Sequence, residues 1–285
     1  ACGAFFVGAL NYITNTSTAK ERGANLTLNA AVQTVFGALG YFVGGMLGTY
    51  DLYWAFALQI GQLFFTGVAF YLLLGPDLTA QKAPDIKEAV RSLNFFSSFQ
   101  TKDIQLSQSL WILLGVSALT FLGYTSFDQS FNYYLKDVFD LATSYNGSFK
   151  GAVGLISLIA TMTLGMYLVK QTDLNKSTTY ILFICAFFMG AVCLAPGLAS
   201  FFALNLIFYG FYAISVPMVQ DLITKQATPT TQGTVLGFYQ ASQSFGRIIG
   251  AFVAGLLYDV NVLGPFILGS LAFLIAAIGV KIYQK

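Results

Sequence analysis

Two charged residues, Asp128 and Arg247, lie inside long apolar stretches of the chain. A charge in the hydrocarbon of a membrane costs at least ~2.5–3.5 kcal/mol, so an embedded charge indicates a partner, contact with water or a function. Asp128 follows Leu110 by 18 residues, ~27 Å at helical rise, and Arg247 follows Gln232 by 15 residues, ~22 Å. If both stretches enter a membrane from the same side, the two charges lie at comparable depth.

The chemistry open to these charges is proton or cation binding. Asp128 is expected to take up a proton or bind a cationic solute, with Arg247 adjusting its affinity for the proton. The alternative is structural. In that case Asp128 sits in water at the outer interface, because the polar segment Gln129–Lys136 follows it, and Arg247 stabilises packing or reaches toward the interface. Both interpretations stay open at the level of sequence.

Uncharged polar side chains and aromatic rings also recur inside the apolar stretches. They are Asn11, Asn15, Asn29, Gln33, Gln59, Gln62, Gln129, Asn132, Asn205, Gln240 and Gln243, with Tyr12, Phe127, Tyr133, Tyr209, Tyr212 and Tyr239. Lipid offers no hydrogen-bond partner, so these groups are expected to point inward. Taken singly, each is explained by interhelical hydrogen bonding or aromatic packing. Together they predict a cavity for a mostly apolar, amphipathic solute. A phosphate would instead need clustered Arg or Lys side chains to bind it.

The composition fixes the class of protein that positions these residues. Charged residues make up 9% of the chain, against about 25% in soluble domains, and the mean hydropathy is +0.69. Runs of about 20 apolar residues recur along the whole length, which is typical of membrane-spanning helices rather than of alternating barrel strands. The sequence therefore predicts an all-α membrane protein in contact with the lipid bilayer. A net charge of +2 is too small to indicate nucleic-acid binding.

Features of enzymes and of cofactor sites are missing from the sequence. Cys2, Cys185 and Cys193 are scattered through apolar stretches and the chain has no histidine, so we expect neither a disulfide framework nor a metal site. The sequence has no serine in a G-x-S-x-G setting and no phosphate-binding loop. We therefore expect no enzymatic activity and no cofactor. If ATP hydrolysis powers this protein, a partner protein would have to carry it out.

Apolar periodicity divides the chain into nine spans. They are 1–19, which reads as the end of a span whose beginning is missing, then 24–48, 52–74, 108–136, 146–170, 177–196, 199–226, 231–258 and 262–283. The stretch 76–107 is too polar for lipid and is predicted to be a linker. Within it, Asp85–Phe95 has apolar residues at helical spacing beside basic ones, so a short helix lying on the membrane face is expected.

If the chain reverses direction at each hinge between spans, most of its basic residues fall on one side of the membrane. Eleven fall on one side: Lys20, Arg22, Lys82, Lys87, Arg91, Lys102, Lys170, Lys176, Lys225, Lys281 and Lys285. Two, Lys136 and Lys150, fall on the other. Basic loops remain in the cytoplasm, so the linker and the C-terminus are predicted to be cytoplasmic, with the protein in the plasma membrane. Near that surface, Glu21, Arg22, Asp221 and Lys225 are candidates for salt bridges that gate the cytoplasmic side.

An internal repeat links the two ends of the chain. Shifting 233–257 back by 210 positions, with no gap, gives nine identities in 25 positions, and three of the identities are glycines. Glycine in a membrane helix marks close approach of a neighbouring backbone, so both copies are expected to be interface helices. The candidate packing residues are Gly40, Gly44, Gly45, Gly250 and Gly255.

Several stretches resemble the major facilitator superfamily of transporters. Lys20–Gly48 is similar to the superfamily's junction between its fourth and fifth helices. Gly40–Gly45 looks like the antiporter motif G-P-x-x-G-G, with Tyr41 where the motif has proline. Arg247–Gly255 resembles the eleventh helix of bacterial multidrug-efflux members, and Gly165–Lys176 looks like a degenerate form of the basic cytoplasmic loop.

The resemblance implies an architecture and a function. It implies a partial twelve-helix fold in which 1–75 is the remnant of an N-terminal bundle (helices 4–6), 76–107 the cytoplasmic linker and 108–285 a complete C-terminal bundle (helices 7–12). The first three helices would be missing. Helices 7 and 11 are neighbours in that family, so Asp128 and Arg247 could pair.

The function implied is proton-coupled export of drugs or small amphipathic metabolites, by a monomer. An uptake permease for a sugar or small metabolite is the first alternative, favoured by Tyr41 in place of proline. A receptor or assembly protein without transport activity is the second.

Overall fold

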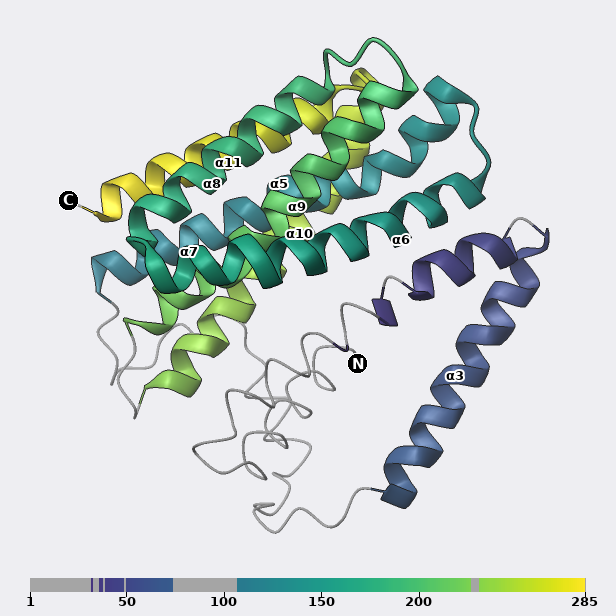
Figure 1. Ribbon diagram of the computed structural model, residues 1–285, viewed down its shortest axis with the longest axis horizontal. Coiled ribbons are helices and arrows are strands. Elements are labelled where there is room, and N and C mark those ends of the chain that lie inside the picture. The colour runs from purple at the N-terminus through teal and green to yellow at the C-terminus, as the bar shows by residue number, and fades with distance from the viewer. Residues whose placement is uncertain are drawn as a thin grey trace.

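The computed structural model describes residues 32, 36–37, 39–48, 50–73, 107–226 and 231–284, and nearly all of them are helical (Figure 1). The elements are a short helix Leu39–Gly48, α3 (Leu52–Leu73), α5 (Gln108–Phe139), α6 (Thr143–Ala160), the π-helical turn η2 (Thr161–Gly165), α7 (Met166–Gln171), α8 (Leu174–Val192), α9 (Leu198–Thr224), α10 (Gln232–Val260) and α11 (Gly264–Tyr283). The expectation of an all-α membrane protein is confirmed. The predicted span 1–19, the linker 76–107 except its last residue, and the membrane-face helix Asp85–Phe95 lie outside the described residues.

Local chemistry sets where the helices begin and end. The Ser107 side chain accepts a hydrogen bond from the backbone N–H of Leu110 at 3.2 Å and so caps the start of α5. Asp140 ends the same helix in the left-handed conformation, with φ of 50°. Asp173 caps α8 by accepting from the N–H groups of Asn175 and Lys176. These caps place most helix boundaries within a few residues of the predicted ones.

Six of the described helices are long and apolar enough to cross a membrane: Leu52–Leu72, Gln108–Phe139, Tyr145–Val169, Leu174–Val192, Leu198–Thr224 and Gly264–Tyr283. At 29 residues, α10 is also long enough to cross. It is less apolar because it carries glutamine, serine and Arg247 along its length. Its place in the structure is fixed by packing against α5.

The helices from α5 to α11 form one bundle, with α5 at its centre. On one side α5 packs against α10 and α11, while α8 packs against α9 and α11, and α6 against α9. The buried interior is mainly phenylalanine, leucine and small side chains. Phe127 is fully buried and meets the rings of Phe208 and Phe266 at 5.1 and 5.4 Å. Aromatic edge-to-face contacts of this kind hold α5 against α9 and α11.

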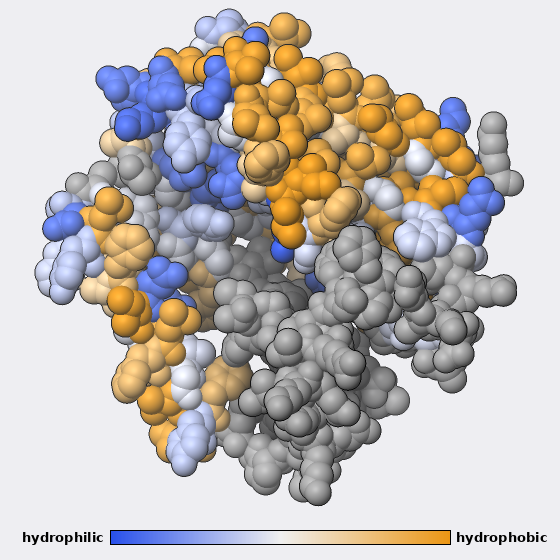
Figure 2. Space-filling view, turned by 180° about the vertical axis from the view of Figure 1, so that it is seen from behind, coloured by the Kyte–Doolittle hydropathy of each residue, from blue (hydrophilic) through white to orange (hydrophobic). Residues whose placement is uncertain are grey.

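The surface of the molecule is largely apolar. Figure 2 shows a mainly hydrophobic face over the bundle, with hydrophilic residues gathered toward its ends. α3 lies apart from the bundle in Figure 1, and most of its side chains are exposed. In a bilayer, lipid replaces the water that would otherwise meet these side chains.

Two neighbouring helices are irregular at similar depth. α6, η2 and α7 form one continuous helix that contains a π-helical turn, and α9 contains Pro217 in its interior. The two irregularities adjoin, because Gly165 at the end of η2 lies against Ile214 of α9. π-turns and interior prolines both interrupt the regular hydrogen-bond ladder, so bending of the bundle is easiest here.

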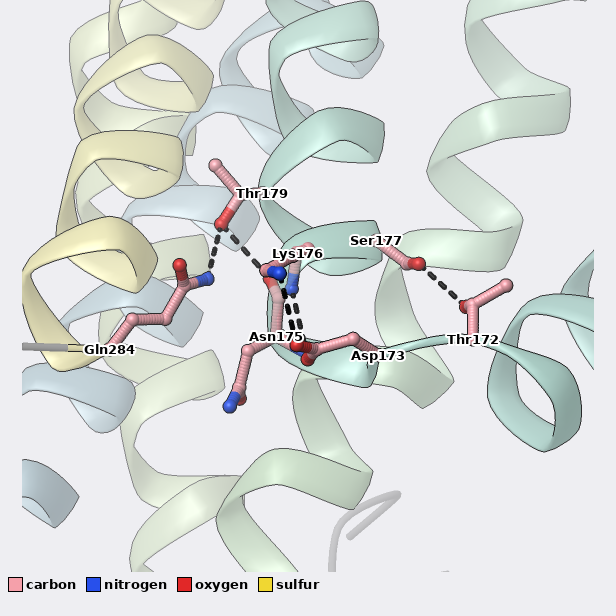
Figure 3. Close-up of polar contacts among 7 residues, drawn as sticks. All are labelled: Thr172, Asp173, Asn175, Lys176, Ser177, Thr179 and Gln284. Carbon is pink, nitrogen blue, oxygen red and sulfur yellow. Dashed lines mark hydrogen bonds and ion pairs between the residues drawn. The ribbon is translucent and has the colours of Figure 1, made fainter.

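The turn between α7 and α8 lies at the same end of the bundle as the C-terminus. Figure 3 shows Asp173 below the first turn of α8 and the Thr172 hydroxyl 2.6 Å from that of Ser177. Gln284, next to the end of α11, donates to the Thr179 hydroxyl at 2.9 Å. This end therefore holds both the C-terminus and the turn at Thr172 and Asp173.

Candidate functional site

A buried ion pair joins three helices in the interior of the bundle. The Lys150 ammonium of α6 forms a salt bridge with the Asp128 carboxylate of α5. The Tyr209 hydroxyl of α9 donates to the same carboxylate oxygen at 2.8 Å and accepts from Lys150 at 2.7 Å. We call these three residues the charged triad. Each member contacts both others, so the two charges and the hydroxyl satisfy one another away from water.

The triad is buried unequally. Lys150 is 6% exposed and Asp128 is 22% exposed, while Tyr209 is buried. The Lys150 ammonium also lies 5.4 Å from the centre of the Phe131 ring and 4.8 Å from that of Tyr209. The rings add a favourable surface for the cation. The carboxylate is the member that water, a proton or a solute reaches most easily.

The sequence interpretation missed Lys150. Counting it as a charge on the outer side was wrong, because the side chain is buried inside the bundle. α6 begins at Thr143, three residues before the predicted start of its span at 146, and Lys150 lies almost two turns inside the helix. At seven residues past Thr143 it is ~10 Å along the helix axis. A lysine two turns inside an apolar span was the available signal.

Asp128 does not pair with Arg247 in the structure. Its cationic partner is Lys150, whereas the Arg247 guanidinium lies over the ring of Phe121, with its carbon 4.7 Å from the ring centre. Phe121 and Asp128 are both on α5, seven residues or ~10 Å apart. The expected pair is therefore replaced by two separate charge centres on one side of α5.

Stacked tyrosines occupy the space between these charge centres. Tyr124 of α5 and Tyr212 of α9 stack with ring centres 4.1 Å apart and planes within 2°. Tyr212 also meets the edge of Phe121 at 6.5 Å. We call Phe121, Tyr124 and Tyr212 the aromatic wall. At one end it interacts electrostatically with Asp128, and at the other with Arg247.

The other polar residues proposed from the sequence are distributed unevenly. Gln243 is buried and Gln240 half-buried on α10, and Asn205 is fully buried, with its amide donating to the Phe201 carbonyl at 2.7 Å. Gln129, Asn132 and Tyr133 are exposed on α5, and Tyr133 lies 6.0 Å from the ring of Tyr258. Asn11, Asn15 and Gln33 lie outside the described residues.

Two of the five predicted packing glycines make close approaches. A Cβ on Gly250 would lie 2.5 Å from the Leu122 carbonyl oxygen of α5, and one on Gly45 would lie 2.6 Å from the Gly147 Cα of α6. Gly40, Gly44 and Gly255 instead face open space. Further close approaches were not predicted, among them those at Gly123, Gly246 and Gly269.

The proposed gate residues are partly described. Asp221 and Lys225 form a salt bridge at 3.0 Å, but they are only four residues apart, in the last turn of α9 and at the residue that caps it. Such exposed pairs contribute only ~0.3–0.5 kcal/mol. Glu21 and Arg22 lie outside the described residues. The pair Asp221–Lys225 thus stabilises one helix end, and a gating role for it stays a prediction.

Protonation of Asp128 would change the charge balance of the charged triad. While Asp128 is ionised, it balances the Lys150 ammonium. A proton on Asp128 would remove that balance and leave a buried cation beside a neutral acid and the Tyr209 hydroxyl, which costs several kcal/mol. The bundle would then favour an arrangement in which Lys150 meets water or another anion. A site of this kind can convert proton binding into helix movement.

Comparisons with known proteins agree with this architecture. The sequence profile of the Major Facilitator Superfamily matches residues 1–251. Among solved structures, the chain is similar to the crystal structure of a bacterial homologue of the iron transporter ferroportin in an inward-facing state, with a TM-score of 0.68 at 14% identity. That match covers 96% of this chain and 66% of the other, so the chain spans about two thirds of its length. No curated protein sequence matches.

Proposed function

Because this chain belongs to the Major Facilitator Superfamily, we propose that it is a secondary active transporter working by alternating access. In this mechanism two groups of helices rock about a site near the membrane midplane and expose it to one side at a time. The fold supports this proposal through its similarity to a transporter of known structure. The boundaries 1–75, 76–107 and 108–285 remain our proposal for the two bundles and their linker.

The single observation that carries the proposal is the charged triad. An ion pair inside a membrane protein is expensive and is found where protons, ions or substrates pass. Here it also joins α5, α6 and α9, and α6 is the helix that meets Gly45 from the N-terminal part of the chain. A change of charge at Asp128 would therefore act on the contact between the two parts.

We propose export of small amphipathic solutes driven by proton influx, with Asp128 as the proton acceptor. The aromatic wall supports an apolar or aromatic solute, and the protonatable carboxylate at its end supports proton coupling. Proton-coupled uptake is the second candidate, favoured by Tyr41 at the position where the antiporter motif has proline.

We place the protein in the plasma membrane with its C-terminus in the cytoplasm. Lys176, Lys225 and Lys281 lie at the end of the bundle that holds the C-terminus, and Lys136 lies at the opposite end. Removing Lys150 from the loop count sharpens this asymmetry, which is the pattern of the positive-inside rule.

Proton movement in everted membrane vesicles tests the proposal. Vesicles are acidified and the acid-sensitive quench of acridine orange is followed while ethidium, a cation, or 2-naphthalenesulfonate, an anion, is added. We expect at least one of the two to release protons through the natural protein and not through Asp128→Asn. Asp140→Asn is the matched control, because that exposed residue ends α5 in the left-handed conformation, which asparagine tolerates. Equal release by Asp128→Asn would remove Asp128 from the mechanism, and no response to either solute would favour a protein without transport activity.

A further inference from the structure

Arg247 is a membrane-embedded cation without an anionic partner among the described residues. The carboxylates that form salt bridges there are Asp128, Asp173 and Asp221, and each pairs with a lysine. The contact shown by the Arg247 guanidinium is the face of the Phe121 ring. A ring face attracts a cation by only ~0.5–2 kcal/mol and accepts none of its five N–H donors in a conventional hydrogen bond.

Arg247 is also too deep to reach the membrane surface. It lies near the middle of α10, which spans Gln232–Val260, so either end of the helix is ~20 Å away along the axis. An arginine side chain is shorter than that distance and cannot carry its charge to the interface. Its charge must be met by water in a cavity or by an anion.

The row of residues on α10 shows which way Arg247 faces. Tyr239, Gln243 and Arg247 are spaced by four residues and lie one above another on one face of the helix. Tyr239 and Gln243 are buried, and the guanidinium interacts electrostatically with both Tyr239 and Tyr212. The adjacent glycines, Gly246 and Gly250, bring the backbone of α10 against α5. Arg247 itself is exposed, and its guanidinium lies against Phe121 of the aromatic wall.

The charge balance of the site leaves one positive charge to be neutralised. Asp128 and Lys150 cancel each other at one end of the aromatic wall, and Arg247 at the other end has no anionic partner in the part of the chain that the structure describes. Building on the transport function proposed above, we propose that Arg247 binds the anionic head of the transported solute while the aromatic wall holds its flat apolar body. The substrate class is therefore an amphipathic aromatic anion, such as a carboxylate or sulfonate.

The chemistry of the groups fits this class. A guanidinium presents parallel N–H donors that match two oxygens of a carboxylate or sulfonate. Phe121 covers one face of the Arg247 guanidinium, so the N–H groups at the edge of the guanidinium remain for the anion. Tyr124 and Tyr212 are half-buried and stack on each other, which leaves ring edges to contact the body of the solute. An aromatic cation would be repelled by the positive charge of Arg247.

Binding to the full-length purified protein in nanodiscs tests the inference. The probes share one ring system and differ in charge: 2-naphthalenesulfonate, neutral 2-naphthalenesulfonamide and cationic 2-naphthylmethylammonium, each measured by equilibrium dialysis. We expect the anion to bind at least about tenfold more tightly than the other two, the contribution of one charge-assisted pair. Arg247→Gln should lose that preference and Arg247→Lys should keep part of it, while Lys281→Gln at the end of α11 should change nothing.

Two further measurements keep the result interpretable. Thermal unfolding without probe shows whether Arg247→Gln folds. If the Phe121 ring supports the body of the solute, Phe121→Leu should lower the affinity for all three probes alike. Preference for the cation, equal anion binding by folded Arg247→Gln, or no binding of the anion would each overturn the inference. Proton release by ethidium alone in the vesicle assay would also overturn it, while leaving the transport function intact.

Discussion

At the scale of single residues, the interior of the bundle holds two charges that stabilise each other. Lys150 is almost fully buried, so its ammonium is tolerated because the Asp128 carboxylate and the Tyr209 hydroxyl surround it. Removing one partner of a buried pair leaves the other uncompensated, whereas removing both relieves the burial of charge. This asymmetry makes the pair testable apart from transport.

Neutralising one residue of the pair should therefore lower the free energy of unfolding more than neutralising both. We expect Asp128→Asn and Lys150→Met each to destabilise the protein by about 3 kcal/mol, the lower end for buried pairs because Asp128 is 22% exposed. The double variant should be closer to the natural protein than the sum of the two changes. Unfolding free energies from the four proteins of this cycle give the coupling directly, and strictly additive losses would show that the two residues do not stabilise each other.

At the residue scale, the sequence located two embedded charges but neither the third charge nor the partner of Asp128. Asp128 and Arg247 were found because a charge is conspicuous in an apolar run. Lys150 was missed because the predicted span began at 146, and the true start at Thr143 moves this residue almost two turns into the helix. The choice between Lys150 and Arg247 as the partner of Asp128 depends on how helices rotate about their axes, which spacing along the chain does not fix.

At the scale of the helix, glycines decide how closely α10 approaches α5. A Cβ at Gly250 would lie 2.5 Å from the Leu122 carbonyl oxygen, and at Gly246 it would collide with that of Ala118. Both glycines lie beside Arg247, so this approach also sets the height of the guanidinium over Phe121. Packing and site geometry are therefore linked on this helix.

Replacing Gly250 by alanine should separate the two helices. We expect Gly250→Ala to destabilise the protein by about 1–3 kcal/mol, the usual range for overpacking. Gly255→Ala is the matched control, because it lies on the same helix and nothing stands within 4 Å of its Cβ position. Its stability should stay the same or rise by up to about 1 kcal/mol through helix propensity. Thermal unfolding in detergent compares the pair, and a Gly250→Ala protein as stable as Gly255→Ala would contradict the packing.

Helix boundaries were the more predictable part of the fold. Hydropathy located every described span, because the length of an apolar run follows from the thickness of the bilayer. Caps moved the ends: Asp173 starts α8 at Leu174, three residues before the predicted 177. The role of each glycine was less predictable. Gly40 and Gly250 match under the 210-residue shift, yet Gly250 packs against α5 and Gly40 faces open space.

At the scale of the whole molecule, the two parts of the chain meet at one end. Gly45 of the short helix Leu39–Gly48 lies against Gly147 near the start of α6, and Phe42 lies against Gly151 one turn further along. This contact is near the end of the bundle opposite the C-terminus. If the protein works by alternating access, this contact must open during each cycle.

A reversible cross-link across this contact tests whether transport proceeds by rocking of the two parts. The Cβ of Phe42 lies 3.4 Å from the Cβ position of Gly151, close to the spacing in disulfides. Phe42→Cys with Gly151→Cys, made in the full-length protein with Cys2, Cys185 and Cys193 replaced by alanine, should form a disulfide on mild oxidation. We predict that oxidation stops solute-driven proton release and that reductant restores it, while each single cysteine variant is unaffected. Undiminished release from the fully cross-linked protein would contradict the account.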